Sequence, residues 1–115
     1  MFLEEIEKKL LEIDPNVDYG VVKKSRLDTA WNYIVFNRTN INFSASKASA
    51  SDVFDVHIIR ENYIPEGLET QVIKKLEELP GVRAFDKPEF RYTTKPNTDT
   101  VVEMLTISFV RARKS

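Results

Sequence analysis

Apolar residues near the N-terminus recur at helical spacing and predict a first helix. Glutamates and lysines occupy the positions between them, as on the solvent face of an amphipathic helix. The pair Asp14-Pro15 ends the pattern, because proline is poorly compatible with a continuing helix. The apolar positions are Phe2, Leu3, Ile6, Leu10 and Ile13.

From residue 31 the pattern changes to aromatic and β-branched residues, WNYIVF at 31–36, which predicts a strand. The following NRTN at 37–40 is rich in turn residues, and INF at 41–43 again suits a strand. We therefore expect a hairpin here, or at least two strands. The first strand is apolar on both faces, because Trp31, Tyr33 and Val35 alternate with Ile34 and Phe36.

The next apolar segment, DVFDVHIIR, alternates with the period of two that is expected of a half-buried strand. Phe54, Val56 and Ile58 are predicted to face the core, and His57 to be exposed on the other side. A second helix is predicted to open at Pro65 and to stop near Gly81. Its apolar positions are Leu68, Val72, Leu76 and Leu79.

Two more strands are predicted after this helix. The first covers residues 82–94 and contains Pro88, which favours an edge position. The second covers residues 100–111 and is joined to the first by a turn, KPNTD at 95–99. Its core-facing residues are expected to be Val101, Leu105, Ile107 and Phe109.

These elements predict one α+β domain over residues 1–115, with a mainly antiparallel sheet, two helices and the order helix, strands, helix, strands. Two helices can cover only one face of a small sheet. Either the sheet curls onto itself, or another molecule buries its second face. Trp31, Tyr33 and Val35 are therefore a candidate subunit interface.

The tract SASKASAS at 44–51 lies between two predicted strands, so it joins strands within one domain. Its serines and alanines offer little apolar area to offset the entropy of ordering them, which favours a mobile loop or hairpin arm. Two readings remain open: an arm that becomes ordered on assembly, or a surface loop without a role. The candidate arm residues are Ser46, Lys47, Ala48 and Ser49.

Charge and composition give no bias toward a particular ligand. Seventeen Lys and Arg against eighteen Asp and Glu give a net charge of −1, so the chain as a whole does not attract nucleic acid. The chain has no cysteine and no apolar run long enough to span a bilayer, and we expect a soluble intracellular protein that contacts no membrane. The basic tail at 111–115 offers Arg111, Arg113 and Lys114 for contact with phosphate or an acidic protein, or it serves only to solubilise the end of the last strand.

No constellation for catalysis is visible. His57 is the only histidine, and the three glycines are isolated and form no phosphate-binding loop. The sequence contains no GxSxG motif. We therefore expect no catalytic residue, no cofactor, no metal site and no enzymatic activity.

Several strings resemble small neck and tail proteins of long-tailed bacteriophages and of prophages in Gram-positive bacteria. They are DTAWNYIVFNR, DVFDVHIIRENYIPEGLE, VIKKLEELPGVR and TTKPNTDTVVEMLTISFVR, and the likeness runs from about Leu27 to Arg113. Within them, WNYIVF, IPEGLE and KPNTDTVVEM carry the resemblance. Proteins of this group are called tail-completion, tail-terminator, head-tail joining or minor capsid proteins.

The resemblance implies a structural role in virion assembly. Such proteins form homomeric rings, often of six subunits, that cap the tail tube or join it to the head, and DNA passes through them without specific binding. The implied partners are further copies of the chain and tail-tube or head-connector proteins. The implied location is the virion, assembled in the cytoplasm of the host bacterium. A head-closure or minor capsid protein of the same neck stays an alternative, as does a small nucleic-acid-binding module that uses Arg111, Arg113 and Lys114.

Overall fold

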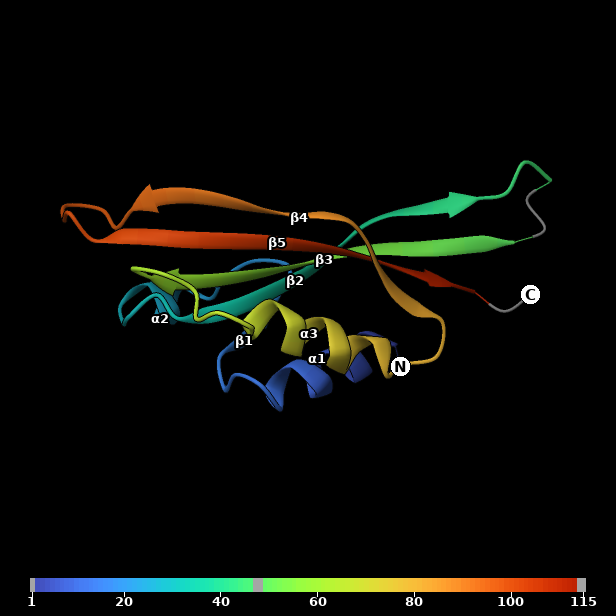
Figure 1. Ribbon diagram of the computed structural model, residues 1–115, viewed down its shortest axis with the longest axis horizontal. Coiled ribbons are helices and arrows are strands. Elements are labelled where there is room, and N and C mark those ends of the chain that lie inside the picture. Colours follow the sequence, from blue (N-terminus) through green and yellow to red (C-terminus); the bar gives the residue numbers. More distant parts are fainter. Residues whose placement is uncertain (1, 47–48, 114–115) are drawn as a thin grey trace.

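The computed structural model describes residues 2–46 and 49–113, which form three helices and a five-stranded sheet (Figure 1). The sheet has the order β1-β2-β3-β5-β4, in which β1 is parallel to β2 and all other neighbours are antiparallel. The fold is α+β with a mainly antiparallel sheet. In chain order the elements are α1 (Phe2–Leu11), β1 (Val17–Tyr19), α2 (Lys24–Leu27), β2 (Tyr33–Phe43), β3 (Ala50–Glu61), α3 (Leu68–Glu77), β4 (Val82–Thr94) and β5 (Val101–Ala112).

Two elements, β1 and α2, lie outside the predicted order of helix, strands, helix, strands. The three residues of β1 and the four of α2 are too short to show a periodic pattern in the sequence. The prediction of two helices is therefore wrong, because the short α2 is a third helix. The strand β1 pairs with β2 only from Ile34 to Phe36, so within the described part of the chain no strand pairs with β2 on that side from Asn37 to Phe43.

The predicted turn at residues 37–40 is also wrong, because β2 runs through it without a reversal. Asn37 and Arg38 pair with Asp55 and Phe54 of β3, and pairing resumes at Asn40 after a bulge at Thr39. The hydroxyl of Thr39 donates to two acceptors, the backbone carbonyl of Val53 at 3.1 Å and Oδ1 of Asn40 at 2.8 Å. The bond to Val53 holds the extra residue against the partner strand, which explains how a turn-like sequence stays extended.

The helices α1 and α3 lie side by side against one face of the sheet (Figure 1). Their apolar residues Ile6, Leu10, Val72 and Leu76 are completely buried, as the helical pattern predicted. The helix α3 begins at Leu68 rather than at Pro65, because Gly67 adopts a left-handed conformation with φ of 89°. The sheet residues of this main core include Phe36, Phe54, Val56, Ile58, Leu105, Ile107 and Phe109.

The molecule is elongated, with extents of 52 × 27 × 26 Å. The sheet is strongly twisted, and both of its ends project beyond α1 and α3 (Figure 1). The β2–β3 hairpin and the end of β5 form one projection, and the β4–β5 turn forms the other. The helices therefore cover the middle of one face and leave both ends bare.

The alternation in β5 was predicted correctly for Leu105, Ile107 and Phe109 but not for Val101. Val101 is 43% exposed, because it lies on the helix face beyond the reach of α3. Its neighbour Val102 is completely buried on the other face, in a second apolar cluster with Tyr33, Val35 and Ile59. Both faces of the sheet thus carry a core, and the second is the smaller.

Candidate functional site

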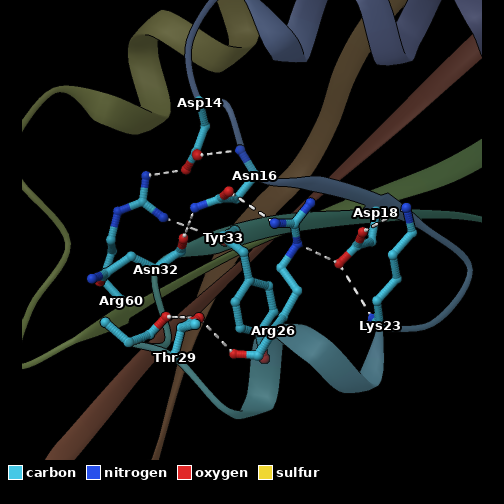
Figure 2. Close-up of polar contacts among 10 residues, drawn as sticks. Asp14, Asn16, Asp18, Lys23, Arg26, Thr29, Asn32, Tyr33 and Arg60 are labelled. Carbon is cyan, nitrogen blue, oxygen red and sulfur yellow. Dashed lines mark hydrogen bonds and ion pairs between the residues drawn. The ribbon is translucent and has the colours of Figure 1, made fainter.

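A polar network holds the segment between α1 and β2 against the sheet (Figure 2). Asp14 accepts a hydrogen bond of 2.7 Å from Arg60 of β3 and another of 2.8 Å from the backbone N–H of Asn16. The side chain of Asn16 accepts one of 2.8 Å from Arg26 of α2 and donates one of 3.2 Å to the carbonyl of Asn32. The segment that precedes β2 is therefore fixed by specific contacts.

Asp18 of β1 is a second buried anchor of this segment, with 2% of its surface exposed. Its Oδ2 atom accepts a hydrogen bond of 2.9 Å from Nε of Arg26, so an ion pair ties α2 to β1. Among the described residues its Oδ1 atom has no hydrogen-bond partner, and Nζ of Lys23 lies 4.0 Å away. This network explains why so short a strand and helix are ordered.

The second face of the sheet forms an open hollow of about 650 Å³. Its floor includes Tyr33, Val35, Ile59 and Met104, from β2, β3 and β5. One rim is formed by residues 20–22 beside β1, and the opposite rim by the bulge of β4. The rim residues are Gly20, Val21, Val22, Asp86, Lys87, Glu89 and Arg91. The sheet thus curls enough to bring both of its sides around one depression, but it does not close over it.

The three residues predicted as a subunit interface differ in position. Tyr33 and Val35 are buried and line the hollow, while Trp31 packs against the same cluster from the segment before β2. The indole N–H of Trp31 donates a hydrogen bond of 3.3 Å to the carbonyl of Leu27, and Nζ of Lys95 lies 5.9 Å from the ring centroid. Trp31 therefore has partners within its own chain.

His57 lies on the same face as the hollow, and the prediction that it is exposed is wrong. It is half-buried between β2 and β5, where Nε2 lies 2.8 Å from Oδ1 of Asn37 and Nδ1 lies 2.8 Å from Oγ1 of Thr106. Burial lowers the pKa of His57, and the charge of Asp55 opposes that shift. Both ring nitrogens are engaged by neutral side chains, which gives His57 the role of a polar link across three strands.

The strands on either side of the 44–51 tract pair with each other, with Phe43 opposite Ala50. The backbone N–H of Ser44 donates a hydrogen bond of 3.0 Å to the carbonyl of Ser49, and the hydroxyls of Ser44 and Ser46 lie 3.3 Å apart. Ser46 and Ser49 are exposed. The other two candidate arm residues, Lys47 and Ala48, lie outside the described residues.

Arg111 and Arg113 converge on one buried carboxylate, that of Asp52. Nη2 of Arg111 lies 2.9 Å from Asp52, and Nε of Arg113 lies 3.0 Å from it. Hydrogen bonds from Arg113, then from Arg111, hold the pKa of Asp52 below its usual range. The guanidinium of Arg111 also stacks on the ring of Phe2 at 3.6 Å. Both arginines therefore make contacts within their own chain, which weakens the hypothesis that they bind nucleic acid. The third candidate residue, Lys114, lies outside the described residues.

The bare ends of the helix face carry exposed apolar side chains, which the sequence patterns did not reveal as surface. At the hairpin end, Ile41 is 43% exposed and Phe43 is 62% exposed. At the β4–β5 end, Tyr63, Phe90, Tyr92 and Val101 are exposed. The predicted lengths of the strands could have indicated these exposed residues. The strands have 11 to 13 residues and the two long helices have 10. A strand rises about 3.3 Å per residue and a helix about 1.5 Å, so the strands extend beyond the helices.

The described residues contain no cluster of three side chains suited to hold a metal ion. Nor does any helix within residues 2–46 and 49–113 combine the length and the apolar character needed to cross a membrane. Comparison of the chain with protein-family models and with curated proteins finds no match. The surfaces described above, together with the resemblance of the sequence strings, are therefore the basis for a functional proposal.

Proposed function

We propose that this chain is a non-enzymatic virion assembly protein of a phage or prophage, which forms a homomeric ring at the tail end or the head–tail junction. The observation that carries the proposal is the apolar surface that one copy leaves open. This surface comprises the hollow on the second face and the exposed side chains at both ends of the sheet. Large apolar side chains that gather on the surface of a folded protein mark an interaction site.

A ring is the assembly that suits this distribution best. The open surfaces lie at opposite ends of an elongated molecule and on a face that the helices do not cover. Contacts between unlike surfaces of identical copies produce a ring whenever the rotation between copies closes. A protein of net charge −1 also lacks the general attraction for phosphate that would hold DNA as it passes.

Light scattering on the purified chain, followed by negative-stain imaging, tests the proposal. Ring-shaped oligomers are expected, either in solution or on tail tubes purified from the phage that encodes the chain. A compact monomer at every concentration that also fails to bind tail tubes would refute the ring.

Within this proposal, we assign the chain to the tail end, as a tail-terminator or tail-completion protein, and the head-closure or minor capsid role is the alternative. Deletion of the gene from the phage or prophage that carries it separates the two. Loss of a tail-end protein should leave closed, DNA-filled heads beside defective tails. Loss of a head-closure protein should instead leave complete tails beside heads that have lost their DNA. Normal infectious particles after the deletion would count against both roles.

A further inference from the structure

The two ends of the sheet differ in charge when the side chains of the segments below are counted on both faces. We call the hairpin side the basic end: β2 from Asn37, β3 up to Val53 and β5 from Val110, with the described residues that follow it. It holds three arginines, and opposing them are Asp52 and Glu5, which lines a separate pocket together with Arg111. The balance is one positive charge. The arginines are Arg38, Arg111 and Arg113.

The other side, the acidic end, comprises β4 from Glu89 to Thr94, residues 95–103, and residues 61–67. Five carboxylates there oppose Arg91 and Lys95, so the balance is three negative charges. One of them, Glu103, accepts hydrogen bonds from the hydroxyl of Tyr92 at 2.8 Å and from the N–H of Ile64 at 2.7 Å. These bonds place the loop after β3, which carries the exposed Tyr63, beside Tyr92. The five carboxylates are Glu61, Glu66, Glu89, Asp99 and Glu103.

Each end also presents an apolar surface of similar character. Ile41 and Phe43 lie on the helix face of the basic end, in register with Asp52 and Ala50. Phe90 and Tyr92 lie on the helix face of the acidic end, in register with Leu105 and Glu103. One chain therefore carries an apolar patch toward each end of the sheet, and the charges around the two patches have opposite sign.

The strand edges themselves are poorly suited to join copies. β4 is interrupted between Phe85 and Glu89, where Pro88 lacks a backbone N–H, and the open part of β2 is interrupted by the bulge at Thr39. Bulges and prolines are the features by which edge strands avoid pairing with other chains. Contact between copies is thus better served by side-chain surfaces than by continuation of the sheet.

We propose that the basic end of one copy docks on the acidic end of the next copy, with Ile41 and Phe43 packed against Phe90 and Tyr92. The occupant of each end is a second copy of this chain. The two ends carry opposite charges, so a basic end attracts an acidic end, and two ends of the same kind repel each other. The contact is heterologous, so it extends from copy to copy, and it closes the proposed ring when the rotation between copies returns to the first copy. This inference rests on the proposed ring and names the surfaces that would form it.

The absence of cysteine from the chain allows a direct test by cross-linking. Ala50→Cys and Thr94→Cys place thiols beside the two patches and leave Phe43 and Phe90 in place. The two proteins are mixed in equal amounts and oxidised, and the covalent dimers are separated on a denaturing gel. The two positions lie at opposite ends of the sheet, so a bond between them joins two copies. We expect the heterodimer in clear excess over the proportion that random collision gives. Heterodimer at or below that proportion overturns the proposal.

A matched control uses Leu11→Cys, which places a thiol at an exposed apolar position on α1. Its mixture with Thr94→Cys should give only the random proportion of heterodimer. An equal excess with Leu11→Cys would mean that the contact at Phe43 is not specific, and this too overturns the proposal.

Serine variants separate a failure of this inference from a failure of the proposed function. If rings form, Phe43→Ser and Phe90→Ser should each abolish them, and a mixture of the two variants should recover dimers only, because one intact end remains on each copy. Rings that persist in both variants would contradict the proposed end-to-end contact but would agree with the proposed function. A wild-type chain that never forms rings, even on tail tubes, would instead contradict the proposed function.

Discussion

Asp52 and Arg113 form an ion pair, with Nε of Arg113 3.0 Å from the carboxylate, that joins the beginning of β3 to the residue just beyond the end of β5. Asp52 is only 6% exposed, and Arg111 binds the same carboxylate. The charge of Asp52 therefore holds the two arginines together at the base of the hairpin projection. This contact leads to the first prediction.

Replacement Asp52→Asn should lower the free energy of unfolding by about 1.5–3 kcal/mol near neutral pH, as expected for hydrogen bonds to a charged group. The pKa of Asp52 is below its ordinary value of 3.8 in the folded chain. The stabilisation is therefore present above that value and is lost as the pH falls through the lower, folded pKa. Urea unfolding of both proteins across this range should show their difference shrinking in acid. A difference that stays constant would contradict the assignment.

His57→Gln tests the half-buried histidine. Burial lowers the pKa of His57 below its ordinary value of 6.5, so the unfolded chain binds a proton at a pH where the folded chain does not. Stability should consequently fall as the pH drops through 6.5, and should level off below the folded pKa. Thermal unfolding of the wild type should show this slope, and the variant should lack it. Identical slopes would show that another group titrates in this range.

Phe54 and Phe109 stack with ring centroids 5.3 Å apart, and both are completely buried. Phe54→Ala should lower the free energy of unfolding by about 3–5 kcal/mol, because it leaves a cavity in the main core. The matched control is Phe43→Ala at an exposed position, which should change the stability of the isolated chain by no more than about 0.5 kcal/mol. Similar losses in the two variants, measured by urea unfolding in dilute solution, would contradict the assignment of faces.

Asp14 and Arg60 form a largely buried ion pair of 2.7 Å, in which neither side chain is more than 15% exposed. Asp14→Ala should cost about 3 kcal/mol, because it leaves a buried guanidinium without its counter-charge. The double variant Asp14→Ala/Arg60→Met should recover part of that loss, since the uncompensated charge is removed. A double variant that loses the sum of the two single effects would show that the residues act independently.

The helices and strands with strong periodic patterns could be predicted from the sequence, and the residues that failed show why the rest could not. Val72 is buried where helical spacing placed it, and Phe54 and Leu105 are buried where strand alternation placed them. Val101 follows the same strand alternation, yet it is exposed because the helices do not reach it. The periodicity of a strand does not indicate where a helix stops covering the sheet. The NRTN segment stays extended through a hydrogen bond from Thr39 to the facing strand, a tertiary contact that overrides local turn preference.

The candidate site was predictable only in part. Alternation at Tyr33 and Val35 correctly indicated a second apolar face, because both residues lie on the floor of the hollow. The exposed patches at Phe43 and Phe90 could not be separated from core, since both residues sit in ordinary strand patterns. Their exposure depends on the relative lengths of strands and helices in three dimensions.

The central claim is that copies of this chain form a ring in the neck or at the tail end of a virion. Electron microscopy of purified particles labelled with an antibody against the chain tests it most directly. The account predicts that the label lies at the tail end or the head–tail junction, on a closed ring around the channel. Intact, infectious particles that carry the label nowhere would contradict it.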